Sequence, residues 1–315
     1  MLKHIFAVSF LLSSLSYAQE NKINGWIGIL GAELKTEDNI YYHKDNKKIN
    51  FLNDKAKELD ESLILPTFDI NYGNYFIKTE IKDEFLVKGG YSWEKDNSIY
   101  LTNLGAGIIQ TFENNFFYTF DYKKIKMYEN PYLTGIDRKD IDSDQIDFKL
   151  GFMELYDFVD ITYSFQNIDI DDKVNNDAQQ SGYTHQLEVF PYFLQFNENS
   201  YGGVGFIGGI GKYDGKSNDY NKYGLIYAME YNYQTHKVEL VSSYTQYDFD
   251  TKNSYFNKKR DEKETLFLLK YTKDKLLNNK NLFMNITMLT NKIDSNIDFF
   301  NKEQEVFGIN IGYKF

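Results

Sequence analysis

Hydrophobic and polar residues alternate strictly over the last nine positions of the chain. Odd positions from Phe307 to Phe315 carry Phe, Ile or Tyr, and the even positions between them carry Gly, Asn, Gly and Lys. Successive side chains of a strand point to opposite faces, so this pattern predicts a strand with one apolar and one polar face. An apolar outer face that ends on Phe315 is typical of the closing strand of a transmembrane β-barrel. A strand of a soluble sandwich would show the same alternation.

The alternation recurs along the chain and predicts an antiparallel up-and-down barrel of about fourteen strands. The expected strands lie near residues 25–34, 62–72, 75–93, 99–112, 118–123, 146–152, 161–166, 185–196, 201–213, 223–234, 237–249, 264–271, 282–291 and 306–315. Residues 85–93 could form a separate strand, continue the preceding strand after a bulge, or belong to a loop. Twelve strands are the alternative if one hairpin between residues 75 and 112 is misassigned. Either even number places both ends of the chain on the same side of the membrane.

The breaks between these segments indicate the orientation of the barrel. Short and long breaks alternate, and periplasmic turns are short whereas external loops are longer. Residues 35–60 form the first expected external loop, and Gly73-Asn74 is an expected tight turn. Pro66 and Pro191 fall within expected strands, where a missing N–H donor predicts a β-bulge or a strand end.

The first eighteen residues have the features of a cleaved signal peptide. Lys3 and His4 precede an apolar run over residues 5–15, and small residues near Ala18 suit a cleavage site. The apolar run is too short for a spanning helix. We therefore expect residues 1–18 to be a signal peptide and residues 19–315 to form a single barrel domain in the bacterial outer membrane.

Composition supports export and a barrel. Aromatic residues make up 17% of the chain, with 27 Tyr and 26 Phe, although the mean hydropathy is −0.54. Barrels place such rings at the two membrane interfaces and keep the inner wall polar. The chain has no cysteine, so its stability does not depend on disulfides. A net charge of −11 argues against nucleic acid as a partner.

Several charged residues share the polar face of the expected strands and are candidates for lining the lumen. They are Asp121, Lys123, Asp147, Lys149, Asp160, Glu188, Glu230, Glu239 and Lys270. Mixed charges of this kind could line a water-filled pathway and set its selectivity through the local field. They could equally pair across a narrow lumen and close it. The glycines between residues 202 and 211 lack a phosphate-loop signature, so we expect them to let the wall bend or a side chain approach closely.

Sites for catalysis or metal binding are weakly supported. The best candidate for a general base is His185, with Ser181 or a loop acid beside it, but an ordinary interfacial histidine explains it more simply. The acidic runs near Asp142 and Asp169 lack the spacing of an EF-hand and suit solvated loops. We expect no enzymatic activity, no cofactor and no metal site.

Four stretches carry a resemblance to a known family. They are Asn130–Thr134 with Arg138, Tyr255–Lys258 with Arg260, Asp294–Ile297 and Tyr313–Phe315. In these the chain resembles an uncharacterised family of exported outer-membrane β-barrel proteins catalogued as domain of unknown function 2860. The resemblance implies export and a barrel, and it supplies no activity or catalytic residues. We expect the first two stretches to lie in external loops, where Arg138 and Arg260 could pair with loop acids and fold the loops inward.

The sequence therefore predicts an outer-membrane β-barrel, most simply a passive channel for small polar solutes. The alternative is a closed structural or recognition barrel that acts through its external loops, with a hydrolase at the rim a distant third. The expected partners are membrane lipid and lipopolysaccharide, with small polar solutes in the lumen. The barrel-assembly machinery is a further expected partner, and it would recognise the last strand through Tyr313 and Phe315.

Overall fold

The computed structural model of the 315-residue chain describes residues 26–39, 47–52, 63–81, 85–93, 97–155, 159–170, 174, 176–191 and 194–314. The predicted signal peptide and Phe315 lie outside these residues. Among the described residues, no helix is long and apolar enough to cross a membrane.

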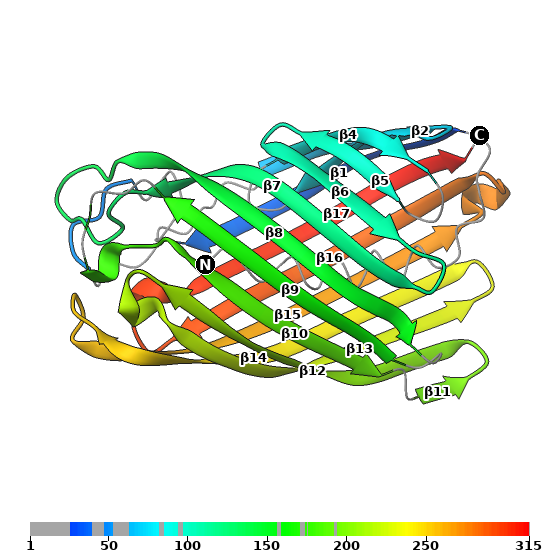
Figure 1. Cartoon of the computed structure of the whole chain (residues 1–315). Coiled ribbons are helices and arrows are strands. Elements are labelled where there is room, and N and C mark those ends of the chain that lie inside the picture. The colour runs from blue at the N-terminus through cyan, green and yellow to red at the C-terminus, as the bar shows by residue number, and fades with distance from the viewer. Residues whose placement is uncertain are drawn as a thin grey trace.

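The structure is a single antiparallel sheet that closes on itself (Figure 1). The strands are β1 (Trp26–Asn39), β2 (Leu63–Tyr72), β3 (Tyr75–Ile81), β4 (Phe85–Ser92), β5 (Ser98–Thr102), β6 (Gly105–Thr111), β7 (Phe116–Tyr128), β8 (Asp140–Leu155), β9 (Val159–Ile170), β10 (Gly182–Pro191), β11 (Leu194–Asn197), β12 (Ser200–Tyr213), β13 (Tyr220–Tyr233), β14 (His236–Asn253), β15 (Lys258–Asp274), β16 (Leu282–Ser295) and β17 (Lys302–Lys314). Within the described residues, four short 3₁₀ helices lie in the connections: η2 (Asn176–Ala178), η3 (Lys216–Asn218), η4 (Leu276–Asn278) and η5 (Asp298–Phe300).

Pairing between the first and last strands closes the barrel. Leu30 of β1 is opposite Phe68 of β2 on one side and opposite Ile311 of β17 on the other. Every strand except the short β11 therefore has two neighbours, and the pairing of β1 with β17 closes the sheet. The alternating last segment is the closing strand, as its pattern predicted.

The barrel has 16 strands, so the prediction of fourteen, with twelve as the alternative, was wrong. The short β11 and β10 together count as one barrel strand, because both pair with β12. The break between them follows Pro191. Pro191 thus ends a strand, as expected. Pro66 does not, because β2 pairs through it with Ala32 of β1 without a shift in register.

The miscount arose between residues 75 and 111, which form four strands instead of two. The strands β3 to β6 are short, and β5 and β6 are joined only by Asn103 and Leu104. The Thr102 hydroxyl stabilises this turn by accepting hydrogen bonds from the backbone N–H groups of Leu104 (3.2 Å) and Gly105 (2.8 Å). A turn without a Gly or Pro between its strands gives little signal in a sequence pattern.

The two ends of the barrel differ. At one end, here called the turn end, strands are joined by short connections such as Gly73-Asn74, and the C-terminus lies there (Figure 1). At the other, the loop end, lie the β1–β2 connection and the η2, η3 and η5 segments. The strand β1 begins at the turn end and β17 finishes there, so the first and last strands of the barrel start and stop on the same side.

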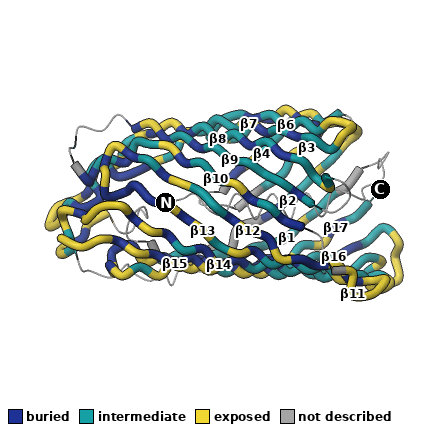
Figure 2. The backbone as a smooth tube through the Cα atoms, turned by 60° about the horizontal axis from the view of Figure 1, so that its bottom comes forward, coloured by how far each residue is buried: buried dark blue, intermediate teal, exposed yellow. Residues whose placement is uncertain are grey.

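Burial alternates along the strands and separates the two faces of the wall (Figure 2). In β13 the odd positions Tyr223, Leu225 and Tyr231 are exposed, whereas Lys222 and Ile226 on the even positions are buried. The exposed apolar positions form the outer face, as in barrels that meet lipid. The buried positions, many of them polar, form the inner face.

Candidate functional site

Every charged residue that the sequence placed on the inner face has the parity of that face. Asp147, Lys149, Asp160, Glu188 and Glu239 are buried, and Asp121, Lys123, Glu230 and Lys270 are half-buried. Buried charges persist where partners offset the loss of hydration. The contacts of these residues therefore define the chemistry of the inner wall.

Asp147 is the centre of one cluster, on β8. Its carboxylate accepts hydrogen bonds from the side-chain amides of Gln145 and Gln166, both at 2.6 Å, and lies 3.7 Å from Lys123 Nζ. Asp121 of β7 is directly opposite Asp147, and it accepts a hydrogen bond from the Tyr100 hydroxyl. Donors on four strands thus hold two neighbouring carboxylates in place.

Glu239 is the centre of a second cluster, nearer the turn end. Its two carboxylate oxygens lie 3.2 Å from Lys237 Nζ and 3.4 Å from Lys270 Nζ. Lys237 also lies 3.1 Å from Glu230. Glu230, Glu239 and Lys270, which the sequence predicted for the inner face, therefore lie together here. With Lys237 they form a row of alternating charges across β13, β14 and β15.

A third group of polar residues connects β10 to β16. Gln186 donates to Glu188 and accepts from Lys222. On the next strands, the Tyr247 hydroxyl donates to Glu264 at 2.7 Å, and the Asn291 amide donates to the same carboxylate at 3.2 Å. The inner wall is therefore a band of hydrogen-bonded charges of both signs.

Sequence reasoning missed part of this band. Lys222, Glu264 and Lys302 are buried on the inner face, and Lys302 lies 3.6 Å from Glu37 across the β1–β17 seam. Their positions in the alternating pattern could have identified them. Lys222 lies two residues from Gly224, and Glu264 lies six residues from Lys270, so each falls on the polar face of its expected strand. Residues at the ends of expected strands were left out, because the strands extend farther than the alternation of apolar residues.

Asp160 and the glycines of β12 serve the wall itself. Asp160 accepts a hydrogen bond of 2.7 Å from the backbone N–H of Glu154, where the β8–β9 register shifts. A Cβ on Gly209 would lie 2.9 Å from Lys222 Cε, and one on Gly205 would lie 2.7 Å from the Phe190 ring. The glycines thus let inner-face side chains approach the wall closely, as expected.

At the loop end, loop segments pack together into what we call the cap, comprising residues 47–52, 129–139, 176–181, 214–219, 254–257 and 296–301. Its apolar core contains Ile49, Tyr132, Ala178, Ile297, Phe299 and Phe300. The Tyr132 ring lies 5.4 Å from that of Phe299. These residues come from loops far apart in sequence, so the cap is a small folded unit.

The segment after β1 is joined to the β7–β8 loop by backbone hydrogen bonds. The N–H of Gly135 donates to the carbonyl of Ile49, and that of Arg138 donates to the carbonyl of Lys47, both at 2.7 Å. Lys48 and Asp137 form a bridge between the two segments. Because β7 and β8 lie several strands away from β1 in the sheet, this connection runs across the barrel mouth.

The two arginines of the family-like stretches contact aromatic rings. Arg138 is fully buried, donates to the Pro131 carbonyl at 2.9 Å and lies 4.0 Å from the centre of the Tyr128 ring. Arg260 lies in β15, not in a loop. Its guanidinium is 3.7 Å from the centre of the Phe249 ring and 4.2 Å from that of Phe300, and its ion pair, at 3.4 Å, is with Glu262 of its own strand.

Asp177 of η2 ties three loops of the cap. Its carboxylate accepts backbone N–H groups from Ser254 (2.6 Å) and Ser217 (3.3 Å). Burial raises the pKa of the Asp177 carboxyl, but these hydrogen bonds to its charged form outweigh burial, and the net pKa lies below the ordinary 3.8. Asn253 donates to Tyr132 (3.2 Å) and to Ser217 (3.1 Å), which extends the network to the β7–β8 loop.

The histidine considered for catalysis lies on the outer face. His185 Nδ1 is 2.5 Å from the Tyr163 hydroxyl, and its ring lies among those of Tyr163, Phe165 and Tyr183. Ser181 instead exchanges hydrogen bonds with the backbone of Ile170. The described part of the chain holds no group of three or more His, Cys, Asp or Glu residues that could bind a metal. Tyr313 accepts a hydrogen bond from Asn281 at the turn end.

Several solved structures are similar to this chain. They include a loop L8 deletion mutant of OmpT from Vibrio cholerae (12% identity, 92% of this chain and 99% of that chain, TM-score 0.38) and an anion-selective porin from Comamonas acidovorans (11%, 92% and 98%, 0.40). A bacterial polysaccharide outer membrane secretin is similar at 8% identity, over 94% of this chain and 100% of that chain, with a TM-score of 0.49.

Among curated proteins, none matches this chain. One protein family does match, over residues 23–314, which is nearly the whole sequence. Its description is "Protein of unknown function (DUF2860)". The resemblance seen in the four short stretches thus extends along the whole barrel, and the chain belongs to the DUF2860 family.

Proposed function

We propose that this barrel is a passive channel for small polar solutes in the bacterial outer membrane, with the cap narrowing its external mouth. The observation that carries the proposal is the contrast between the two faces of the wall. The outer face exposes residues such as Leu30 and Phe206, which suits lipid, while the inner face carries ion pairs and amides. A polar inner wall is suited to water and polar solutes.

The charges of the inner wall would set selectivity. Asp147 pairs with Lys123, and Glu239 pairs with Lys270. Asp121, Glu188, Glu230 and Lys149 lie on the same inner face. Neutralising one member of a cluster changes the local field without removing the wall. Ion preference is therefore the property most directly linked to these residues.

The cap would set the aperture. The segment 47–52 runs across the mouth to the β7–β8 loop, and Arg260 joins the wall to the cap through Phe300. In this orientation the loop end faces the exterior and the short turns face the periplasm. Export by the predicted signal peptide, contact with lipopolysaccharide and recognition of the last strand through Tyr313 by the assembly machinery belong to the same proposal.

The test is swelling of liposomes that contain the refolded protein and are loaded with an impermeant polysaccharide. Glucose added outside should enter and swell the liposomes, and a larger trisaccharide should enter more slowly. Heat-denatured protein provides the control. Liposomes that contain folded protein but swell no faster than protein-free ones would count against the channel.

A closed recognition barrel is the second candidate, and the packing of the cap favours it. Arg138 of the β7–β8 loop is fully buried, and the loops of the cap share an apolar core, which suits a preformed binding surface. Such a barrel would bind lipopolysaccharide or another surface ligand through the cap. Binding of purified lipopolysaccharide by wild type, lost when residues 129–139 are replaced by a short linker, together with no solute entry in either protein, would support this candidate over the channel.

A further inference from the structure

At the turn end, four polar side chains of β14, β15 and the β13–β14 turn are hydrogen-bonded into what we call the turn-end cluster. Lys273 Nζ lies 2.6 Å from Thr235 Oγ1 and 2.8 Å from His236 Nε2. His236 Nδ1 in turn lies 2.8 Å from the Tyr271 hydroxyl. Tyr271 and Lys273 have the parity of Phe267, which is exposed on the outer face of β15. The cluster therefore faces the outside of the barrel and not its lumen.

The hydrogen-bonding roles in the cluster follow from the chemistry of lysine. A lysine ammonium has three N–H donors and no acceptor, so His236 Nε2 must accept from Lys273. The imidazole proton is then on Nδ1, which donates to the Tyr271 oxygen. Among the described residues, the third N–H of Lys273 and the O–H of Tyr271 have no acceptor. The cluster thus presents two donors, one on each side of the His236 ring.

The positive charge of the cluster is not balanced by an acid. Within the described part of the chain, the Lys273 ammonium contacts only neutral side chains. The adjacent Asp274 has inner-face parity and pairs instead with Lys314 at 3.6 Å. Lys275 and Lys280, in the connection from β15 to β16, are exposed and add further positive charge. This patch is therefore positive although the whole chain carries a net charge of −11, and it favours an anionic partner.

The cluster lies where the apolar part of the outer face begins. Along β15, the outer positions next to Tyr271 toward the middle of the barrel are Leu269 and Phe267. On the two neighbouring strands, Val238 and Ile286 are directly opposite Tyr271. Tyrosine and basic residues at this boundary occupy the headgroup level of a bilayer. An anion bound by the cluster would therefore have apolar side chains beside it on the membrane side.

We propose that the turn-end cluster binds the phosphate of an anionic phospholipid, whose acyl chains lie on the outer face of β14 to β16. The Lys273 ammonium and the Tyr271 hydroxyl donate to two oxygens of the phosphate, and the ammonium also neutralises its charge. His236 is a positioning residue that holds both donors. The inference rests on the membrane placement proposed above and not on an open lumen, so a folded barrel that is silent in permeation assays still binds the lipid.

The experiment is native mass spectrometry of the full-length protein, processed as exported, in detergent and titrated with phosphatidylglycerol. Wild type should retain this lipid more strongly than phosphatidylcholine, because the lysines repel the choline cation. Lys273→Met keeps the length of the side chain but removes the charge and the donors, and it should weaken phosphatidylglycerol binding about tenfold. Tyr271→Phe keeps the ring and removes one donor, and it should weaken binding about threefold.

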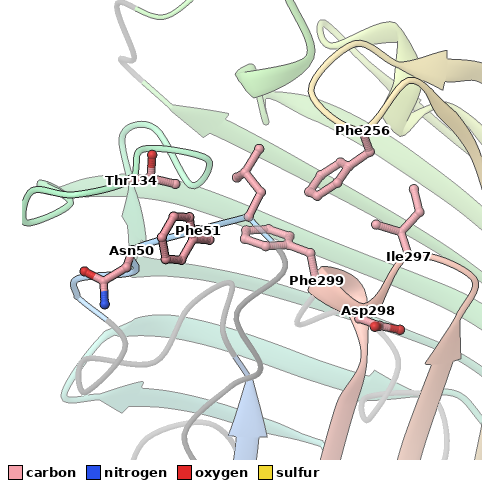
Figure 3. A pocket seen from close by; sticks show the side chains of 8 residues that line it. Asn50, Phe51, Thr134, Phe256, Ile297, Asp298 and Phe299 are labelled. Atoms are coloured by element: carbon pink, nitrogen blue, oxygen red, sulfur yellow. The ribbon is translucent and has the colours of Figure 1, made fainter.

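The matched control is Lys292→Met, which should bind phosphatidylglycerol as wild type does. Lys292 also lies on the outer face, but toward the loop end, and it pairs with Asp294 at 3.1 Å. Protease resistance of the cap verifies the fold of each variant, because the cap lies at the opposite end of the barrel, where the rings of Phe256 and Phe299 pack 5.4 Å apart (Figure 3).

Two results would overturn the proposal. One is equal phosphatidylglycerol binding by wild type and Lys273→Met. The other is displacement of the lipid by an equal concentration of glycerol 3-phosphate, which has the phosphate but no acyl chains and should not compete. That second result would assign the cluster to a free phosphate compound instead of a membrane lipid.

Discussion

The guanidinium carbon of Arg260 lies 4.2 Å from the centre of the Phe300 ring, so that a cation on the barrel wall holds an aromatic residue of the cap. Arg260 is on β15 and Phe300 on η5, between β16 and β17. Phe249 of β14 lies on the same guanidinium at 3.7 Å. Both rings and the arginine are buried, where cation–π contacts are strongest.

Replacing Arg260 with Lys should loosen the cap and leave the barrel folded. The charge and the pair with Glu262 can persist, but a compact ammonium does not stack on two rings as a planar guanidinium does. We expect the free energy of cap closure to fall by about 2 kcal/mol. Limited proteolysis of the loops measures this, and cleavage should be roughly thirtyfold faster when opening precedes cleavage.

The matched control for this variant is Lys259→Arg. Lys259 is the preceding residue, lies on the exposed side and pairs with Asp248 at 2.9 Å. An exposed pair of this kind contributes little. If both variants are cleaved at the wild-type rate, the Arg260 contacts do not hold the cap.

Asp147 and Asp144 offer a paired test of the inner wall. They lie on the same strand with opposite parity: Asp147 is buried among amides and Lys123, and Asp144 is exposed and accepts a hydrogen bond from Tyr122 at 2.7 Å. Asp147→Asn should move the reversal potential in a salt gradient toward anion preference, because it removes a negative charge from the pathway. Asp144→Asn should leave it unchanged. A shift for Asp144→Asn alone would place the conducting path elsewhere.

The pH dependence of the cap should follow Asp177. Its pKa in the folded cap lies below the ordinary 3.8, so its contribution to stability is complete above pH 3.8 and is lost as the pH falls through the lower folded value. Pepsin cleavage of the cap should therefore rise in that acid range. At neutral pH, the cap of Asp177→Asn should be cleaved faster than that of wild type by a protease that is active there. In the acid range, the variant should lack the part of the rise in cleavage that comes from protonation of Asp177. Parallel pH profiles for both proteins would contradict the assignment.

The lipid-facing role of the outer wall can be tested at Leu30. This side chain is 71% exposed on β1, and its strand partners are Phe68 and Ile311. Leu30→Arg should destabilise the folded barrel in lipid vesicles by up to about 2–4 kcal/mol, as expected for Arg near the bilayer midplane. Glu305→Arg, on the exposed face of β17 toward the loop end, should cost far less. Urea titration in vesicles measures both, and equal effects would argue against a lipid belt at Leu30.

Much of the fold could be predicted from the sequence, because a barrel wall has period two. The outward positions of β13, from Tyr223 to Tyr233, and the last strand were read correctly, and all the charged residues chosen by parity have inner-face parity. The strand number was wrong at β4 to β6, where strands of five to eight residues alternate too briefly. There, turn stability comes from hydrogen bonds to Thr102, which composition does not reveal.

The cap could not be predicted from the sequence. Its core joins Ile49, Tyr132 and Phe300, which are far apart in the chain and carry no shared pattern. The two arginines were identified, but the expected loop acids were not their main partners: both guanidinium groups contact aromatic rings, and the acid beside Arg260 is Glu262 of its own strand. Loop packing is set by contacts among distant segments, so local alternation contains no information on it.

The most direct test of the channel is single-channel conductance of the refolded barrel in a planar bilayer under a salt gradient. Wild type should show steady conductance, and Arg260→Lys should show a larger conductance as the cap loosens. Asp147→Asn should shift the reversal potential, whereas Asp144→Asn should not. Folded protein that stays silent in all of these variants would contradict the channel, and the cap would then be the functional surface of a closed barrel.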